Sequence, residues 1–273
     1  MYGTVVSTSA ADVLLSTAKF DLTKGSFNIL TLNGAYTGIT SVYVNIVAFD
    51  QKRQTLYTAI NGDVTYIYTT DVNLGVPKAP YSIGASMILH LIYDNPNSRL
   101  LVLYQANNST LLAAVEPQSV TPLLTVSPSY TTYWNGALDE KGQIYYLLTQ
   151  GPNGPEVLTF DLSTGKLVSN FPVKISGFGK GIFCDSQSEA LVGMTTNTRG
   201  QESYFIQVYP NSGDSASLVV STTVVQTAFD PIGGNLFWGD QSGALFVFPL
   251  ATKVASKNST FGVETVSIVW SNT

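Results

Sequence analysis

Residues 226–240, QTAFDPIGGNLFWGD, join a short apolar run, an aspartate, a tight polar turn and a second apolar run. The same order of residue types recurs at NIVAFDQKRQTLY (45–57), HLIYDNPNSRLLVL (90–103), NGALDEKGQIYYLL (135–148) and GIFCDSQSEALVGM (181–194). The five aspartates are Asp50, Asp94, Asp139, Asp185 and Asp230, which lie 44, 45, 46 and 45 residues apart. A constant period of this length, with strand-like runs in each unit, predicts a β-propeller.

The same spacing predicts the number of blades. The path from Asp230 through the C-terminus and on from the N-terminus to Asp50 covers 93 residues, which is room for two more intervals. The C-terminal run ETVSIVW (264–270) resembles the runs before the aspartates, and FDLTKG (20–25) resembles FDLSTG (160–165). We therefore expect one all-β domain over residues 1–273: a six-bladed propeller with four-stranded blades, the last one closed by both termini.

Bulk composition excludes some classes of partner. Charged residues make up only 11% of the chain and the net charge is −5, so a nucleic-acid or anionic-membrane partner is not expected. No apolar run approaches the roughly 20 residues that span a bilayer. The low charge also suits packing against partners, so homo- or hetero-assembly is a further expectation.

The single cysteine and the sequons bear on location. Because Cys184 is the only cysteine, the chain cannot form an internal disulfide. Other copies of the repeat have bulky apolar residues at this position, so we expect Cys184 to be buried. The chain begins without a signal-peptide pattern, which fits a cytoplasmic protein or a mature fragment. Sequons occur at Asn107, Asn108 and Asn258. With low charge and many hydroxyl residues, they favour an extracellular or cell-surface location, and a cytoplasmic one stays open.

The five repeated aspartates favour a structural role. An aspartate that opens a turn can accept backbone N–H groups within that turn. Five catalytic carboxylates on five successive blades would be redundant, so we expect them to mark the fold alone.

The stretch Ala228–Asp240 resembles a YWTD-type repeat, with an aspartate turn followed by an aromatic residue and Trp-x-Asp. The chain is therefore similar to the six-bladed group that includes the YWTD, NHL and SMP-30/strictosidine-synthase-like families. For enzyme members, this resemblance implies a calcium ion held at the axis by Glu, Asp and Asn. The corresponding positions here lie four residues before each repeated aspartate and carry no carboxylate. They are Ile46, His90, Asn135, Gly181, Gln226 and, by alignment, Ser267. Because hard cations require anionic oxygens, we expect no metal and no cofactor.

Catalysis is the less favoured interpretation. His90 is the only histidine, so any Ser-His-Asp or Cys-His unit would have to use it. We expect instead that His90 lies on an innermost strand beside the axis, where its ring nitrogens form hydrogen bonds with neighbouring residues or with water. Two carboxylates alone can hydrolyse a glycosidic bond, so a lactonase- or hydrolase-like propeller enzyme remains the alternative.

The favoured hypothesis is a non-catalytic binding or structural propeller that recognises a protein or a glycan. With strands A to D numbered outward from the axis, the D–A and B–C loops form one face around the axis. Aromatic rings beside amides and charged groups are the usual means of holding a sugar or a peptide. The expected binding residues on this face and inner ring are Tyr133, Trp134, Asn135, His90, Lys180 and Gln226.

Overall fold

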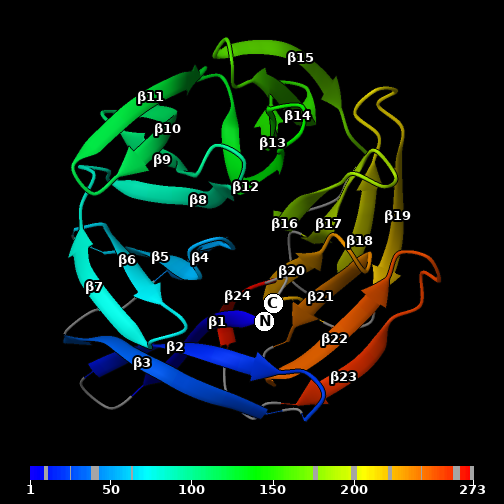
Figure 1. Ribbon diagram of the computed structural model, residues 1–273. Coiled ribbons are helices and arrows are strands. Elements are labelled where there is room, and N and C mark those ends of the chain that lie inside the picture. The colour runs from blue at the N-terminus through cyan, green and yellow to red at the C-terminus, as the bar shows by residue number, and fades with distance from the viewer. Residues whose placement is uncertain are drawn as a thin grey trace.

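The protein is an all-β propeller with four-stranded blades (Figure 1). The computed structural model describes residues 1–8, 12–24, 26–37, 43–62, 64–174, 178–197, 202–220, 223–240, 242–260 and 265–270. These residues form six antiparallel four-stranded sheets arranged around a common axis. No helix among them is long or apolar enough to cross a membrane.

Five sheets are each built from four consecutive strands, and we number them blades 1 to 5. Blade 1 holds β4 (Tyr43–Asp50), β5 (Thr55–Asn61), β6 (Tyr66–Asp71) and β7 (Val76–Tyr81). Blade 2 holds β8 (Met87–Asp94), β9 (Arg99–Ala106), β10 (Ser109–Glu116) and β11 (Ser119–Val126). Blade 3 holds β12 (Thr131–Asp139), β13 (Ile144–Gly151), β14 (Gly154–Asp161) and β15 (Lys166–Pro172).

Blades 4 and 5 follow the same plan. Blade 4 holds β16 (Phe178–Asp185), β17 (Ala190–Thr196), β18 (Ser203–Val208) and β19 (Ser215–Val220). Blade 5 holds β20 (Gln226–Asp230), β21 (Asn235–Gly239), β22 (Ala244–Pro249) and β23 (Ser256–Thr260).

The sixth sheet, which we call the terminal sheet, combines both ends of the chain. It holds β24 (Thr265–Val269), β1 (Tyr2–Thr8), β2 (Asp12–Asp21) and β3 (Ser26–Thr37), in that order. β1 runs antiparallel to β24, with Tyr2 opposite Val269. The prediction that the C-terminal run pairs with the N-terminal segment is therefore confirmed.

The hydrophobic core lies between neighbouring sheets. Leu101 and Leu103 of blade 2 pack with Tyr145 and Leu147 of blade 3, and all four side chains are fully buried. β17 is buried at every position, because each face of its sheet is covered by a neighbouring blade. The outer strands are mostly exposed. The seams between blades thus hold the ring together.

The repeated aspartates close the turns after the inner strands, as predicted. The Asp50 Oδ1 accepts the backbone N–H groups of Lys52 and Arg53 at 3.0 and 2.9 Å. Asp139 and Asp230 accept the equivalent pairs of N–H groups, and Asp185 accepts that of Gln187. The fourth residue after each aspartate has a positive φ of 51 to 61°: Gln54, Ser98, Gln143, Glu189 and Gly234.

Antiparallel strands place these turns on one side of the ring. The A–B and C–D connections share one side, which we call the turn face. The B–C and D–A connections share the other, the loop face.

Cys184 departs from its prediction. The thiol is half-buried rather than buried, at the margin of the cluster between blades 3 and 4. Partial burial, with the nearby charges of Asp139 and Asp185, raises the pKa of the Cys184 thiol to about 12. A thiol with so high a pKa is a poor nucleophile at neutral pH.

Candidate functional site

The inner strands share a local irregularity beside the predicted ring positions. The pairing register of four of them shifts just before Ile46, His90, Asn135 and Gly181. A β-bulge bends its strand and re-aims the side chains around it. These bulges therefore set the direction of the inner-ring side chains at the loop-face end of each strand.

His90 forms a hydrogen bond across the seam between blades 2 and 3. Its Nδ1 lies 3.1 Å from the hydroxyl of Tyr145, whose side chain is fully buried. Burial lowers the pKa of His90 to about 4 and raises that of Tyr145. The imidazole is therefore neutral at physiological pH, and a neutral ring can accept the hydroxyl hydrogen at Nδ1. This agrees with the expectation of a histidine satisfied by its neighbours.

A glycine makes this contact possible. Tyr145 lies on β13, and its hydroxyl crosses the inner strand of its own blade at Gly136. A Cβ atom at Gly136 would overlap the end of the Tyr145 ring. The missing side chain thus opens the path by which Tyr145 reaches His90 on the next blade.

Asn135 and Gln226 are also packed against glycines. Both are buried, at 6% and 4% exposure. The Asn135 amide lies against Gly179 of blade 4, where a Cβ would overlap it, and Gln226 lies against Gly239 in its own blade. The inner-ring amides are thus held in tightly fitted positions.

The seam between blades 4 and 5 has its own inner-strand contact. The Thr227 hydroxyl donates to the backbone oxygen of Lys180 at 3.0 Å, and it occupies the space beside Gly181. The Lys180 side chain itself is exposed. Loss of part of its hydration nevertheless lowers the pKa of Lys180.

The remaining predicted site residues are placed only in part. Tyr133 and Trp134 lie in β12 at the register shift between Thr132 and Asn135. Their side chains lie outside the described part of the chain. The structure thus sets His90, Asn135, Lys180 and Gln226 on four inner strands, and it leaves the aromatic part of the predicted site untested.

Sequence reasoning missed Tyr145 and Thr227, which complete the contacts between blades. Both side chains contact residues about 50 positions away in the chain, so no local sequence pattern predicts these contacts. The available signal was the presence of glycines at inner-strand positions, since Gly136 and Gly181 make room for these two side chains.

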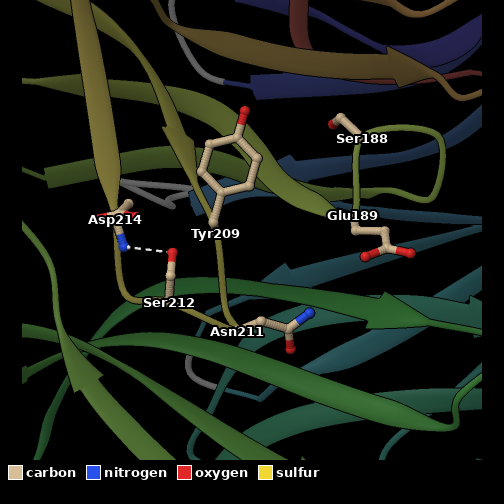
Figure 2. A pocket seen from close by; sticks show the side chains of 6 residues that line it. All are labelled: Ser188, Glu189, Tyr209, Asn211, Ser212 and Asp214. Atoms are coloured by element: carbon tan, nitrogen blue, oxygen red, sulfur yellow. Dashed lines mark hydrogen bonds between the residues drawn. The ribbon is translucent and has the colours of Figure 1, made fainter.

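A shallow depression of about 390 Å³ opens on the turn face of blade 4 (Figure 2). Ser188 and Glu189 come from the β16–β17 turn, and the other lining residues come from the β18–β19 turn: Tyr209, Asn211, Ser212 and Asp214. The backbone N–H of Asp214 donates to Ser212 Oγ at 3.2 Å. The depression lies on the face opposite the predicted binding face.

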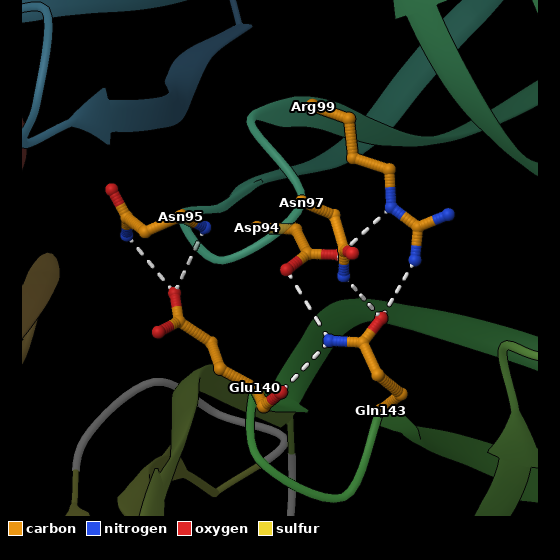
Figure 3. A network of polar contacts seen from close by, with 6 residues as sticks. All are labelled: Asp94, Asn95, Asn97, Arg99, Glu140 and Gln143. Atoms are coloured by element: carbon orange, nitrogen blue, oxygen red, sulfur yellow. Dashed lines mark hydrogen bonds and ion pairs between the residues drawn. The ribbon is translucent and has the colours of Figure 1, made fainter.

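A charged network joins the turn-face ends of blades 2 and 3 (Figure 3). The Asp94 carboxylate is fully buried and accepts Arg99 Nε at 2.8 Å. It also accepts the side-chain amides of Asn97 and Gln143, and Gln143 Oε1 in turn accepts from Arg99 and Asn97. Pro96 stands where the other turns have an N–H donor two residues after the aspartate, so side chains supply the donors here.

Glu140 extends this network. Its Oε1 accepts the backbone and side-chain N–H groups of Asn95 at 3.2 and 2.9 Å, and Asn95 Oδ1 accepts the backbone N–H of Gln51 in blade 1. Three successive blades are thereby linked. Across the described part of the chain, no three His, Cys, Asp or Glu residues are grouped so that they could hold a metal ion.

Comparison with known proteins shows the fold alone. No protein-family model and no curated protein sequence matches this chain. A chain of a nidogen/laminin complex superposes with a TM-score of 0.68 at 12% identity, over 98% of both chains. A chain of the hydrazine synthase of Kuenenia stuttgartiensis superposes with a TM-score of 0.65 at 11% identity, over 97% of this chain and 88% of that one. One propeller thus belongs to a protein–protein complex and the other to an enzyme, so the fold does not decide the function.

Proposed function

We propose that this chain is a non-catalytic binding propeller that recognises a protein or a glycan through its loop face. The observation that carries the proposal is the state of His90. The single histidine is neutral and engaged with the buried Tyr145 hydroxyl across a blade seam. A general base needs a pKa near the working pH and access to a substrate proton, and a half-buried imidazole with a pKa of about 4 suits that role poorly.

The carboxylates support the same proposal. The five repeated aspartates of the turn face are used in the turns themselves or in the network around Asp94. Two groups of inner-strand residues are suited by type to contact: Lys180, which is exposed at a bulge of β16, and Tyr133 and Trp134, whose backbone lies at the bulge of β12. Bulges beside the axis bring such residues to one place on the ring. The nidogen/laminin complex is a precedent for a similar fold in a protein complex.

The same proposal includes the wider organisation of the molecule. The terminal sheet acts as a sixth blade: Phe20 and Ile268 pack with Phe237 of blade 5, and Tyr2 packs with Phe49 of blade 1. Residues 1–273 then form one closed domain, similar to the YWTD/NHL/SMP-30-like group. We place the protein outside the cell or on its surface, on the basis of its three sequons and its low content of charged residues.

A binding screen with paired variants tests the proposal. The wild-type protein is applied to a glycan array and to an array of purified extracellular proteins, and each hit is measured again with Trp134→Ala and Tyr209→Ala. We expect Trp134→Ala to weaken binding at least tenfold at an unchanged melting temperature, and Tyr209→Ala, in the depression on the opposite face, to bind like the wild type. The reverse pattern would contradict the choice of face. A hydrolytic activity that His90→Gln abolishes without loss of stability would replace this proposal with the enzyme alternative.

A further inference from the structure

Among the described residues, no strand pairs with the outer edge of the outermost strand of each sheet, and the six outer strands differ in how that edge is protected. Natural edge strands discourage pairing with other chains by bulges, by lysine and by proline. Five of the six outer strands show a register shift against their inner neighbour: β3, β7, β11, β15 and β23. Several also carry Lys or Pro: Pro77, Lys78 and Pro80 in β7, Pro122 in β11, Lys166 and Pro172 in β15, and Lys257 in β23.

β19, the outer strand of blade 4, has none of these features. Its six residues, SASLVV, pair one-to-one with β18 from Ser215 opposite Val208 to Val220 opposite Ser203, without a register shift. The strand contains no charged residue and no proline. Leu218 and Val219 are 45% and 61% exposed on it. β19 is therefore a regular, uncharged and partly apolar edge at the rim of the ring (Figure 1).

We propose that β19 is a self-association edge, which pairs antiparallel with β19 of a second copy of this chain. The two blades then form one continuous eight-stranded sheet across a two-fold axis. A second copy fits because two-fold contact sets the same surface against itself, and like charges directly opposite each other destabilise such a pair. β19 brings no charge to the contact, whereas self-pairing of β7 or β15 would bring Lys78 or Lys166 of both copies to one edge.

The length of the edge sets the strength of the association. Six residues form a contact much smaller than a stable interface, which involves roughly 20 to 30 residues on each side. Main-chain hydrogen bonds along the edge and the exposed Leu218 and Val219 side chains supply the attraction. The dimer is therefore weak and concentration-dependent.

Sedimentation equilibrium tests the proposal with a matched pair of variants. Val219→Lys places a charge on β19, and Val168→Lys places the same charge at an equally exposed position, 61%, on the already protected β15. We expect the wild type and Val168→Lys to dimerise alike, and Val219→Lys to raise the dimer Kd at least tenfold at an unchanged melting temperature. Ser217→Lys, also exposed on β19, repeats the test should Val219→Lys fold poorly.

Hydrogen exchange identifies the edge directly. Amides of β19 should become more protected as the wild-type concentration rises, and those of β15 should not. A wild type that stays monomeric up to about 1 mM would overturn the proposal, because an edge contact weaker than that is not specific association. Equal weakening of the dimer by Val168→Lys and Val219→Lys, or protection that does not involve β19, would overturn it as well.

Discussion

Near the axis, blades 2 and 3 meet through the neutral pair of His90 and Tyr145, whereas at the turn face the same two blades meet through the buried carboxylate of Asp94. The first contact is one hydrogen bond of 3.1 Å between groups that burial keeps uncharged. The second surrounds a charge with Arg99, Asn97 and Gln143. Together they show how one seam accommodates polar groups at its two ends.

The difference follows from the cost of burial. A neutral polar group needs one good partner when it leaves water, whereas a buried charge needs a counter-charge and several hydrogen bonds. Asp94 lacks the first of the two ordinary turn donors, because Pro96 has no N–H group. The seam therefore depends strongly on the charged contact for stability and more weakly on the neutral one.

The largest effect is expected from Arg99→Ala. It leaves the fully buried Asp94 carboxylate without its counter-charge, which should lower the free energy of unfolding by about 3 kcal/mol. Arg53→Ala is the control: Asp50 is as buried as Asp94, but it keeps two backbone N–H donors, and Arg53 is 63% exposed and lies 3.7 Å away, so the loss of Arg53 should cost about 1 kcal/mol or less. Urea unfolding of both variants measures the difference, and equal losses would show that exposure of the arginine does not distinguish the two pairs.

The second effect is a pH dependence that arises from His90. The pKa of this group is about 4 in the folded protein against its ordinary value of 6.5 in the unfolded chain, so its contribution is complete above pH 6.5 and is lost as the pH falls toward 4. At about 1.4 kcal/mol per pKa unit, the loss amounts to about 2–3 kcal/mol. The free energy of unfolding of the wild type should therefore fall more steeply between pH 6.5 and 4 than that of His90→Gln. Parallel profiles would show that His90 titrates normally in the fold.

A smaller effect is expected from Tyr145→Phe. The substitution keeps the buried ring and removes the hydroxyl that contacts His90, so it should cost about 1–2 kcal/mol. Tyr204→Phe removes an exposed hydroxyl that donates to Glu202 at 2.7 Å and should cost about 0.5 kcal/mol or less. Chemical denaturation compares the two variants. A Tyr145→Phe protein as stable as the wild type would show that the hydrogen bond between Tyr145 and His90 does not stabilise the fold.

The propeller and its turns could be predicted from the sequence because their causes are local. The aspartate at the end of each inner strand binds N–H groups two and three residues later, so the pattern repeats with the blade. The pairing of the two chain ends followed from the same period. Each of these features depends on residues close together in the chain or on a constant interval.

The contacts across the seams could not be predicted, because they join residues about one blade apart. His90 was recognised as a ring residue, but its partner Tyr145 is 55 positions away and lies on the next strand outward. Cys184 was expected to be buried from the bulk of its equivalents, and a smaller side chain at the margin of a cluster stays half-buried. That Tyr133 and Trp134 contact a ligand stays a prediction.

The central claim is that the inner-ring polar groups serve the fold and that the protein binds without catalysis. His90→Gln tests it most directly when unfolding and binding are measured on the same sample, with a ligand identified on the arrays. We predict a lower free energy of unfolding at neutral pH and a Kd within about twofold of the wild type, since a difference that small is well under 1 kcal/mol. Loss of binding or of a turnover activity at unchanged stability would contradict the account.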